Sequence, residues 1–226
     1  MLTVCWAAKG GSGTTVVSCA LALLTAATRE ATRQAGGDPA ADPTWLIDLA
    51  GDVPAAMGLP EPASSGVHEW VVSPSAPPQA LESLGAPAAD GLVLIPRGVA
   101  MASGDLARWA DLGQYLAAGP RHVIVDAGSC APPPALVAAA QQRLLVTRAC
   151  YLALRRAAAS PLVPTGIVVV HEPGRALRAQ DVAYATQAPV AAEINLDPAV
   201  ARAVDAGLLA ARLPRTLSAA LRELAA

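Results

Sequence analysis

Short apolar runs recur along the chain, and alanine- and leucine-rich stretches lie between them. Seven of these runs carry no polar face: LTVCWA, TWLIDL, LVLIP, HVIVD, RLLVT, TGIVVV and PVAAEI. Strands that are apolar on both sides are typical of a parallel sheet covered by helices on both faces. The pattern therefore predicts an α/β fold with a doubly wound, mostly parallel sheet.

The stretches between the strands contain recognisable helices and loops. Helices are predicted over residues 14–28, 103–117, 200–211 and 217–224. Ser103 is placed to cap the second of these, and Asp105 lies in its first turn. Two segments dense in Gly, Pro, Asp and Ser, residues 36–43 and 59–66, are predicted to be loops.

Length and charge limit the classes of protein that fit. The 226 residues suffice for one large α/β domain, so we expect residues 1–226 to form a single domain. Acidic residues outnumber Lys and Arg by 18 to 16, which leaves no overall basic field to attract nucleic acid or anionic lipid.

No membrane-directing feature is evident in the sequence. No segment reaches about 18 uninterrupted apolar residues, and the N-terminus lacks a signal-peptide pattern. Leu217, Leu221 and Leu224 form an apolar stripe without the basic face of a membrane-binding helix. We therefore expect a cytoplasmic protein without a membrane anchor, whose last helix packs on the domain.

Cysteines and tryptophans are both predicted to be core residues. Cys5, Cys19, Cys130 and Cys150 are widely spaced and form no C-x-x-C motif, so small buried thiols are expected rather than disulfides or zinc ligands. Among the four tryptophans, Trp70 is the candidate for a contact with a partner protein.

The stretch AAKGGSGTTVV, residues 7–17, joins the first strand to the first helix. Gly10, Gly11 and Gly13 permit a tight turn there. Such a turn aims backbone N–H groups and the positive end of a helix at one point, which suits a phosphate. A glycine-rich turn that binds nothing is the structural alternative.

This stretch resembles the deviant Walker A motif, K-G-G-x-G-K-[ST], of the ParA/MinD family of P-loop ATPases. The motif is matched at Lys9, Gly10, Gly11, Ser12, Gly13 and Thr15, but Thr14 stands in place of its second lysine. TWLIDL with Asp48 resembles the family's second strand, RHVIVDAG with Asp126 its Walker B strand, and residues 188–213 its closing strand and helix. Residues 51–59, GDVPAAMGL, look most like the TadZ/CpaE branch, which helps to localise pilus machinery.

The resemblance implies a set of ligands and roles. ATP or ADP would be bound by the loop residues Lys9, Gly10, Gly11, Ser12, Gly13, Thr14 and Thr15. Mg²⁺ would be held by Thr15 and Asp126, directly or through water, and the catalytic set would be Lys9, Asp48 and Asp126. Lys9, the only lysine of the chain, would reach the partner's phosphates in an ATP-sandwiched homodimer. Further protein partners would belong to a localised assembly. A structural capping role is the alternative for Asp126.

Several departures from the family pattern predict impaired hydrolysis. Thr14 carries no charge, and the loss of a charge-assisted contact costs about 1.5–3 kcal/mol of binding and about a hundredfold or more in rate. Ala50 stands where relatives place a second aspartate, with Asp52 as its candidate substitute.

Asn195 replaces a proline before Asp197, which is expected to cap the following helix. His171 takes the region of the nucleobase contact and is expected to be a solvent-exposed loop residue.

Three hypotheses follow. The first is a dimeric, nucleotide-binding positioning or scaffolding protein with weak or absent hydrolysis. The second is a slow but genuine ATPase in which Lys9 or an arginine compensates for Thr14, and the third is a nucleotide-free interaction module. The choice between ATP and GTP, and the structure that is positioned, stay open.

Two other constellations carry less weight. A basic face for DNA is conceivable, but a solvated helix face is expected instead for Arg143, Arg148, Arg155 and Arg156. Nucleophilic catalysis by Ser129 or Cys130 with His122 is disfavoured because no G-x-S-x-G or G-x-C setting is present.

Overall fold

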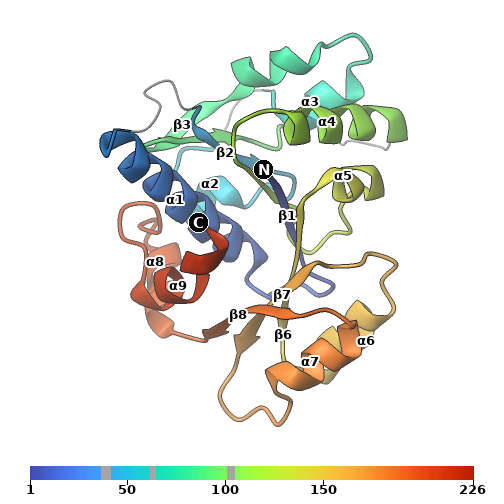
Figure 1. The fold of residues 1–226 in the computed structure, drawn as a ribbon, viewed down its shortest axis with the longest axis vertical. Helices are drawn as coiled ribbons and strands as arrows, with labels where there is room; N and C mark the ends of the chain where they lie inside the picture. Colours follow the sequence, from blue (N-terminus) through green and yellow to red (C-terminus); the bar gives the residue numbers. More distant parts are fainter. Residues whose placement is uncertain (37–41, 62–64, 101–104) are drawn as a thin grey trace.

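An eight-stranded sheet runs through the part of the chain that the computed structural model describes, residues 1–36, 42–61, 65–100 and 105–226 (Figure 1). Its strands are β1 Leu2–Trp6, β2 Thr44–Asp48, β3 Ala86–Ala89, β4 Leu92–Ile95, β5 Val123–Asp126, β6 Gln142–Arg148, β7 Gly166–His171 and β8 Val190–Asn195. Their order is β3-β4-β2-β5-β1-β6-β7-β8, and all neighbours are parallel except β3 and β4. The predicted mostly parallel sheet is confirmed. The antiparallel edge strand β3 was missed because its sequence, APAA, has no β-branched residue.

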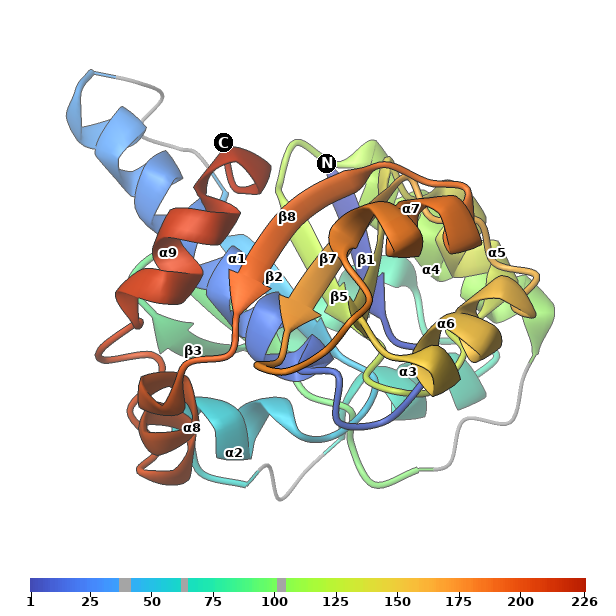
Figure 2. The ribbon, with the colours of Figure 1, turned by 90° about the horizontal axis from the view of Figure 1, so that it is seen from below.

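Helices cover both faces of this sheet. They are α1 Thr14–Gln34, α2 Val53–Met57, α3 Val67–Val72, α4 Leu106–Ala118, α5 Pro134–Ala139, α6 Tyr151–Ala158, α7 Ala179–Thr186, α8 Pro198–Asp205 and α9 Arg215–Leu221, with 3₁₀ turns η1 Pro78–Leu84 and η2 Arg222–Leu224. Figure 2 shows α1, α8 and α9 on one side of the strands and α4 to α7 on the other.

The central strand β1 shows why both faces are apolar. Successive side chains of a strand point to opposite faces. Leu2, Val4 and Trp6 therefore pack with α3, α4 and α5, whereas Cys5 packs with α1, α2 and α9. Burial on both sides is what removes the alternation of polar and apolar residues from the strand sequences.

Helix boundaries differ from the predicted ones for local reasons. The helix α1 extends past residue 28 to Gln34, and its last turns carry the Glu30–Arg33 ion pair. The helix α4 begins at Leu106 because Asp105 is its cap, accepting a hydrogen bond from the Ala107 N–H at 2.9 Å. The predicted cap Ser103 lies outside the described residues, as do residues 37–41 of the predicted loop 36–43.

The C-terminal elements pack back on the domain, as predicted. Leu217 and Leu221 of α9 are buried with residues of α1 and β8, and Leu224 is partly buried against them. Asp197 caps α8 by accepting from the Ala199 N–H, and the Thr216 hydroxyl donates to its second oxygen at 2.5 Å. The helix α8 ends at Asp205, before the predicted residue 211, and Gly207 follows with a positive φ of 63°.

Two predictions about core residues are wrong. Cys5 and Cys19 are buried, but Cys130 is exposed and Cys150 is partly exposed. Trp70 is only 3% exposed, and its indole N–H donates to the Pro77 carbonyl at 2.9 Å, so this side chain is not available to a partner. Within the described residues, no helix is both long and apolar enough to cross a membrane.

Candidate phosphate-binding site

The loop from Lys9 to Gly13 connects β1 to the first turn of α1. Gly11 and Gly13 have φ angles of 75° and 89°, in the left-handed region that glycine adopts without strain. The Ser12 hydroxyl is buried and donates to the Lys9 carbonyl at 2.8 Å, which ties the loop to itself. Because α1 begins at Thr14, its unpaired N–H groups and positive end lie at this loop.

The two positions of the motif that would carry positive charge differ from each other. Thr14 is only 5% exposed and brings no charge to the loop. The Lys9 ammonium group donates to the Gly10 carbonyl at 3.2 Å. In the described part of the chain Lys9 makes no ion pair, so the lysine is not committed to an acid of its own chain.

Asp126 lies at the end of β5, in register with Cys5 of β1, and is fully buried. Its Oδ1 accepts hydrogen bonds from the Ser18 hydroxyl at 3.1 Å and from the Gly128 N–H at 3.2 Å. Its Oδ2 is buried and has no hydrogen-bond partner. Burial raises the pKa of Asp126 to about 6, although the nearby Thr15 hydroxyl lowers it in part.

Asp48 is the register neighbour of Asp126 on β2, and its carboxylate is fully engaged. One oxygen accepts from the N–H groups of Ala50 and Gly51 at 2.9 and 2.6 Å, and the other accepts from Val53 at 3.1 Å. Burial is the main cause that raises the pKa of Asp48. This side chain therefore organises the turn that leads into α2.

Ala50 lies directly beside the end of β5. A Cβ atom built on Gly128 would lie 2.7 Å from the Ala50 Cβ, so the two backbones approach closely. The turn residue Asp52 is exposed and makes no side-chain hydrogen bond that caps α2. Ala50 therefore brings no carboxylate to this position, whereas Asp52 lines a cavity together with Ala127 and Ser129, which follow Asp126.

The donor set at the loop fits Mg²⁺ when phosphate is present. The Thr15 hydroxyl and the Asp126 Oδ2 are hard oxygen ligands, and the Thr15 hydroxyl is close enough to the Asp126 carboxylate to lower its pKa. Mg²⁺ sites with phosphates use one or two protein oxygens, with phosphate oxygens and waters completing the octahedron. Within the described ranges no group of three or more His, Cys, Asp or Glu residues could hold a metal by itself.

A recess of about 600 Å³ adjoins the loop on the side of β7 and β8. Its walls are mostly aliphatic, with Gly11, Ser12 and Gly13 at one end and Asn195, Leu196 and Asp197 at the other. Arg148 lines it and is paired with Glu172. His171 ends β7, so the expected loop position for this histidine is wrong, although its side chain is partly exposed and its Nε2 lies 2.7 Å from the Glu193 carboxylate.

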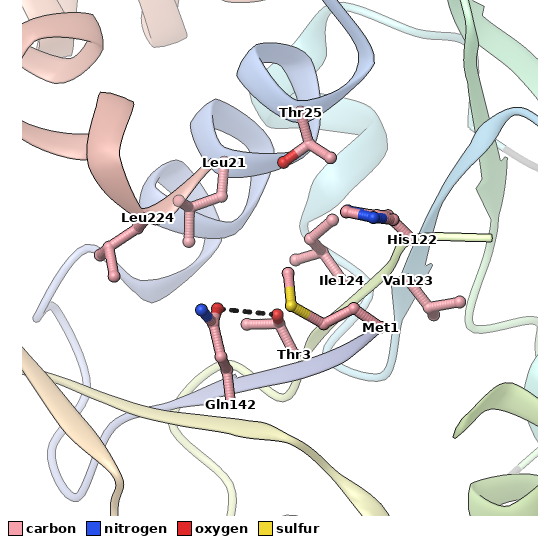
Figure 3. Close-up of a pocket in the computed structure, with 9 residues that line it drawn as sticks. All are labelled: Met1, Thr3, Leu21, Thr25, His122, Val123, Ile124, Gln142 and Leu224. Atoms are coloured by element: carbon pink, nitrogen blue, oxygen red, sulfur yellow. Dashed lines mark hydrogen bonds between the residues drawn. The ribbon is translucent and has the colours of Figure 1, made fainter. Parts of the chain in front are cut away.

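A much smaller cavity lies at the opposite edge of the sheet, around Met1 and His122 (Figure 3). Its volume of about 10 Å³ is room for one water molecule at most. Because His122 precedes β5 whereas Ser129 and Cys130 follow it, the strand separates the histidine from both nucleophiles. The arrangement excludes the hydrolase constellation that these residues suggested.

Comparison with known proteins places the fold. No protein-family model matches the sequence, and a search of curated proteins found no relative. Among solved structures, a ParA family ATPase from Chlorobium tepidum TLS has a TM-score of 0.75 at 16% identity, covering 99% of this chain and 97% of its own. The MinD cell division protein of Aquifex aeolicus has a TM-score of 0.75 at 17% identity, covering 99% and 94%. The chain has the fold of the ParA and MinD ATPases.

A third structure with this fold is the septum site-determining protein MinD from Pyrococcus horikoshii OT3, complexed with Mg-ADP. Its TM-score is 0.73 at 15% identity, and the match covers 100% of this chain and 95% of that one. At such identities the likeness concerns the fold, so the chemistry of this chain has to be argued from its own residues.

Sequence reasoning missed two residues of this region. Ser18 lies one turn after Thr14, so its contact with Asp126 depends on how α1 packs against β5. Arg97 follows β4 and reaches over the turn at Gly51. Neither residue belongs to a short motif, and only the tertiary structure brings Ser18 to Asp126 and Arg97 to Gly51.

Proposed function

We propose that this protein binds ATP or ADP with Mg²⁺ at residues 9–15 and acts as a positioning or scaffolding factor of the ParA/MinD type. One observation carries the proposal. The buried, unpartnered Oδ2 of Asp126 lies near the Thr15 hydroxyl at the N-terminus of α1. An isolated buried carboxylate is costly, whereas a carboxylate beside a phosphate-bound Mg²⁺ is stabilised.

We infer that hydrolysis is weak or absent. The uncharged Thr14 takes the place of the lysine that stabilises charge on the transferred phosphoryl group. Ala50 brings no carboxylate to the neighbourhood of Asp126, and the oxygens of Asp48 are engaged by the backbone. Binding by N–H groups and the helix end tolerates these losses better than catalysis does, because turnover depends on charge placed for the transition state.

We further propose that the active form is a homodimer in which Lys9 contacts the partner's nucleotide. The absence of an ion pair on Lys9 within the described residues supports this role. The positioned structure is an assembly with its own protein partners, and the resemblance of the sequence of residues 51–59 to the TadZ/CpaE branch favours pilus machinery.

Calorimetric titration with Mg²⁺ and a non-hydrolysable ATP analogue tests the proposal, with the Thr14→Lys variant measured alongside. Binding to both proteins, tighter by about tenfold in the variant, is expected because lysine adds a charge-assisted contact. Hydrolysis is measured separately, as phosphate release from Mg²⁺-ATP. Release by the wild type at rates typical of the family would establish a genuine ATPase. No heat with either protein would leave a nucleotide-free interaction module.

A further inference from the structure

Arg97 is a partly buried cation at the carboxyl edge of the sheet, and it forms no ion pair with any of the residues that the structure describes. It directly follows Pro96 after β4, and its Nε is buried with no hydrogen-bond partner. In the described part of the chain it makes no ion pair, whereas Arg108, Arg121, Arg148 and Arg175 all pair with acids. Asp52 and Glu61 line recesses that Arg97 also lines, but neither forms an ion pair with it, so the partly buried guanidinium is available to an anion brought by a ligand.

The backbone around Arg97 is held in place by one acid. Glu69 of α3 accepts hydrogen bonds from the N–H groups of Val99 at 2.8 Å, Ala100 at 2.6 Å and Gly66 at 2.7 Å. Gly98, with a φ of 84°, leaves no room for a side chain beside the Glu69 carboxylate. These three hydrogen bonds hold the backbone near Arg97 in place, and so fix the point from which the Arg97 side chain extends.

The side chain extends over Gly51 toward the end of β5. The Arg97 Nε lies 3.2 Å, and its Cζ 3.4 Å, from the position that a Cβ of Gly51 would occupy. A larger residue at Gly51, whose φ is 94°, would push the guanidinium away. The next residue back, Ala50, contacts Gly128 after β5.

A single cavity of about 620 Å³ connects this guanidinium to the vicinity of the phosphate loop. Arg97, Ala50 and Ser129 all line it, and so does the exposed acid Asp52. The Ser129 Oγ lies 3.7 Å from the position that a Cβ of Gly10 would take. An anion that is bound at the loop and points toward the end of β5 would therefore enter the cavity that Arg97 lines.

We propose that Arg97 binds the terminal phosphate of the nucleoside triphosphate and supplies the positive charge that Thr14 does not. The planar guanidinium offers two parallel N–H donors, which match two phosphate oxygens. Because β2 and β5 lie between β4 and the loop strand β1, Arg97 would reach only the phosphate farthest from the loop, which is the third one. This inference rests on the proposed nucleotide binding, and it adds the residue that distinguishes triphosphate from diphosphate.

The test compares two ligands on matched variants. Wild type, Arg97→Gln, Arg97→Lys and the exposed control Arg156→Gln are titrated calorimetrically with Mg²⁺ plus either a non-hydrolysable ATP analogue or ADP. Arg97→Gln is expected to weaken binding of the ATP analogue by about tenfold or more and of ADP by less than about twofold. Arg97→Lys is expected to recover part of the loss, and Arg156→Gln to bind both ligands as the wild type does.

A second comparison uses the Thr14→Lys background. There the introduced lysine takes over the charge, so adding Arg97→Gln is expected to cost less than about threefold. Equal losses for both ligands, or no loss for the ATP analogue, would overturn the role of Arg97 while leaving nucleotide binding intact. A wild type that binds neither ligand would instead refute the proposed function and this inference together. Thermal unfolding of each variant reports whether it is folded.

Discussion

Asp48 and Asp126 lie side by side in register at the ends of β2 and β5, but only Asp48 has both carboxylate oxygens hydrogen-bonded. Both side chains are fully buried, and the charge of Asp48 contributes to the raised pKa of Asp126. The pair therefore divides into one acid that shapes a turn and one that keeps an oxygen available. This division gives separate, measurable consequences for stability.

Replacing Asp126 with Asn is expected to stabilise the nucleotide-free protein at pH 7.5. The pKa of Asp126 is raised from 3.8 to about 6 in the folded state, so the folded protein binds the proton more tightly than the unfolded chain. Stability then falls as pH rises from about 4 to 6, by up to about 3 kcal/mol for two pKa units. Urea unfolding at pH 5 and pH 7.5 measures this. An equal effect of the substitution at both pH values would contradict the assignment.

Replacing Asp48 with Ala is expected to destabilise the protein by about 3 kcal/mol. Three backbone N–H groups of the turn before α2 would lose their acceptor, and each buried, unpaired N–H group costs about 1–3 kcal/mol before the turn relaxes. Asp52→Ala serves as the control, since Asp52 is exposed, and is expected to change stability by less than about 0.5 kcal/mol. Similar values for the two variants in urea unfolding would show that Asp48 does not support the turn.

Restoring both missing groups is expected to create an ATPase. Thr14→Lys returns the charge to the loop, and Ala50→Asp adds a carboxylate next to Gly128. Each group stabilises developing charge or positions water, so the double variant should exceed the wild-type rate by about a hundredfold or more. Phosphate release with Mg²⁺-ATP measures the effect. An active wild type whose rate the two substitutions do not raise would argue against lost catalytic groups.

The four thiols are expected to react at very different rates with a thiol reagent. Burial raises the pKa of the Cys5 thiol to about 12 and raises that of Cys19 well above its usual range. Cys130 is exposed and should be modified within the first minutes, whereas Cys5 and Cys19 should react only after unfolding. Mass spectrometry of peptides before and after denaturation distinguishes the sites. Rapid labelling of Cys5 in the folded protein would contradict its burial in the sheet.

The sequence was informative where local chemistry decides the structure. Uninterrupted apolar strands indicated the parallel sheet, because both faces of a covered sheet select the same residue types. The three glycines before Thr14 indicated the turn at the first helix, since Gly11 and Gly13 need positive φ. Asp197 was recognisable as a helix cap because a cap acts within two or three residues.

The tertiary structure decided everything that depends on residues distant in the chain. The strand order brings β2 and β5 together, so only the fold reveals that Asp48 and Asp126 are neighbours, and that one is occupied by backbone while the other is not. Trp70 and Cys130 were misjudged for the same reason, because exposure depends on what other segments cover. Arg97 lies over Gly51 because β4 pairs with β2, a contact with no counterpart in any local pattern. Local patterns thus determined the elements and the loop, while long-range packing determined which side chains have partners.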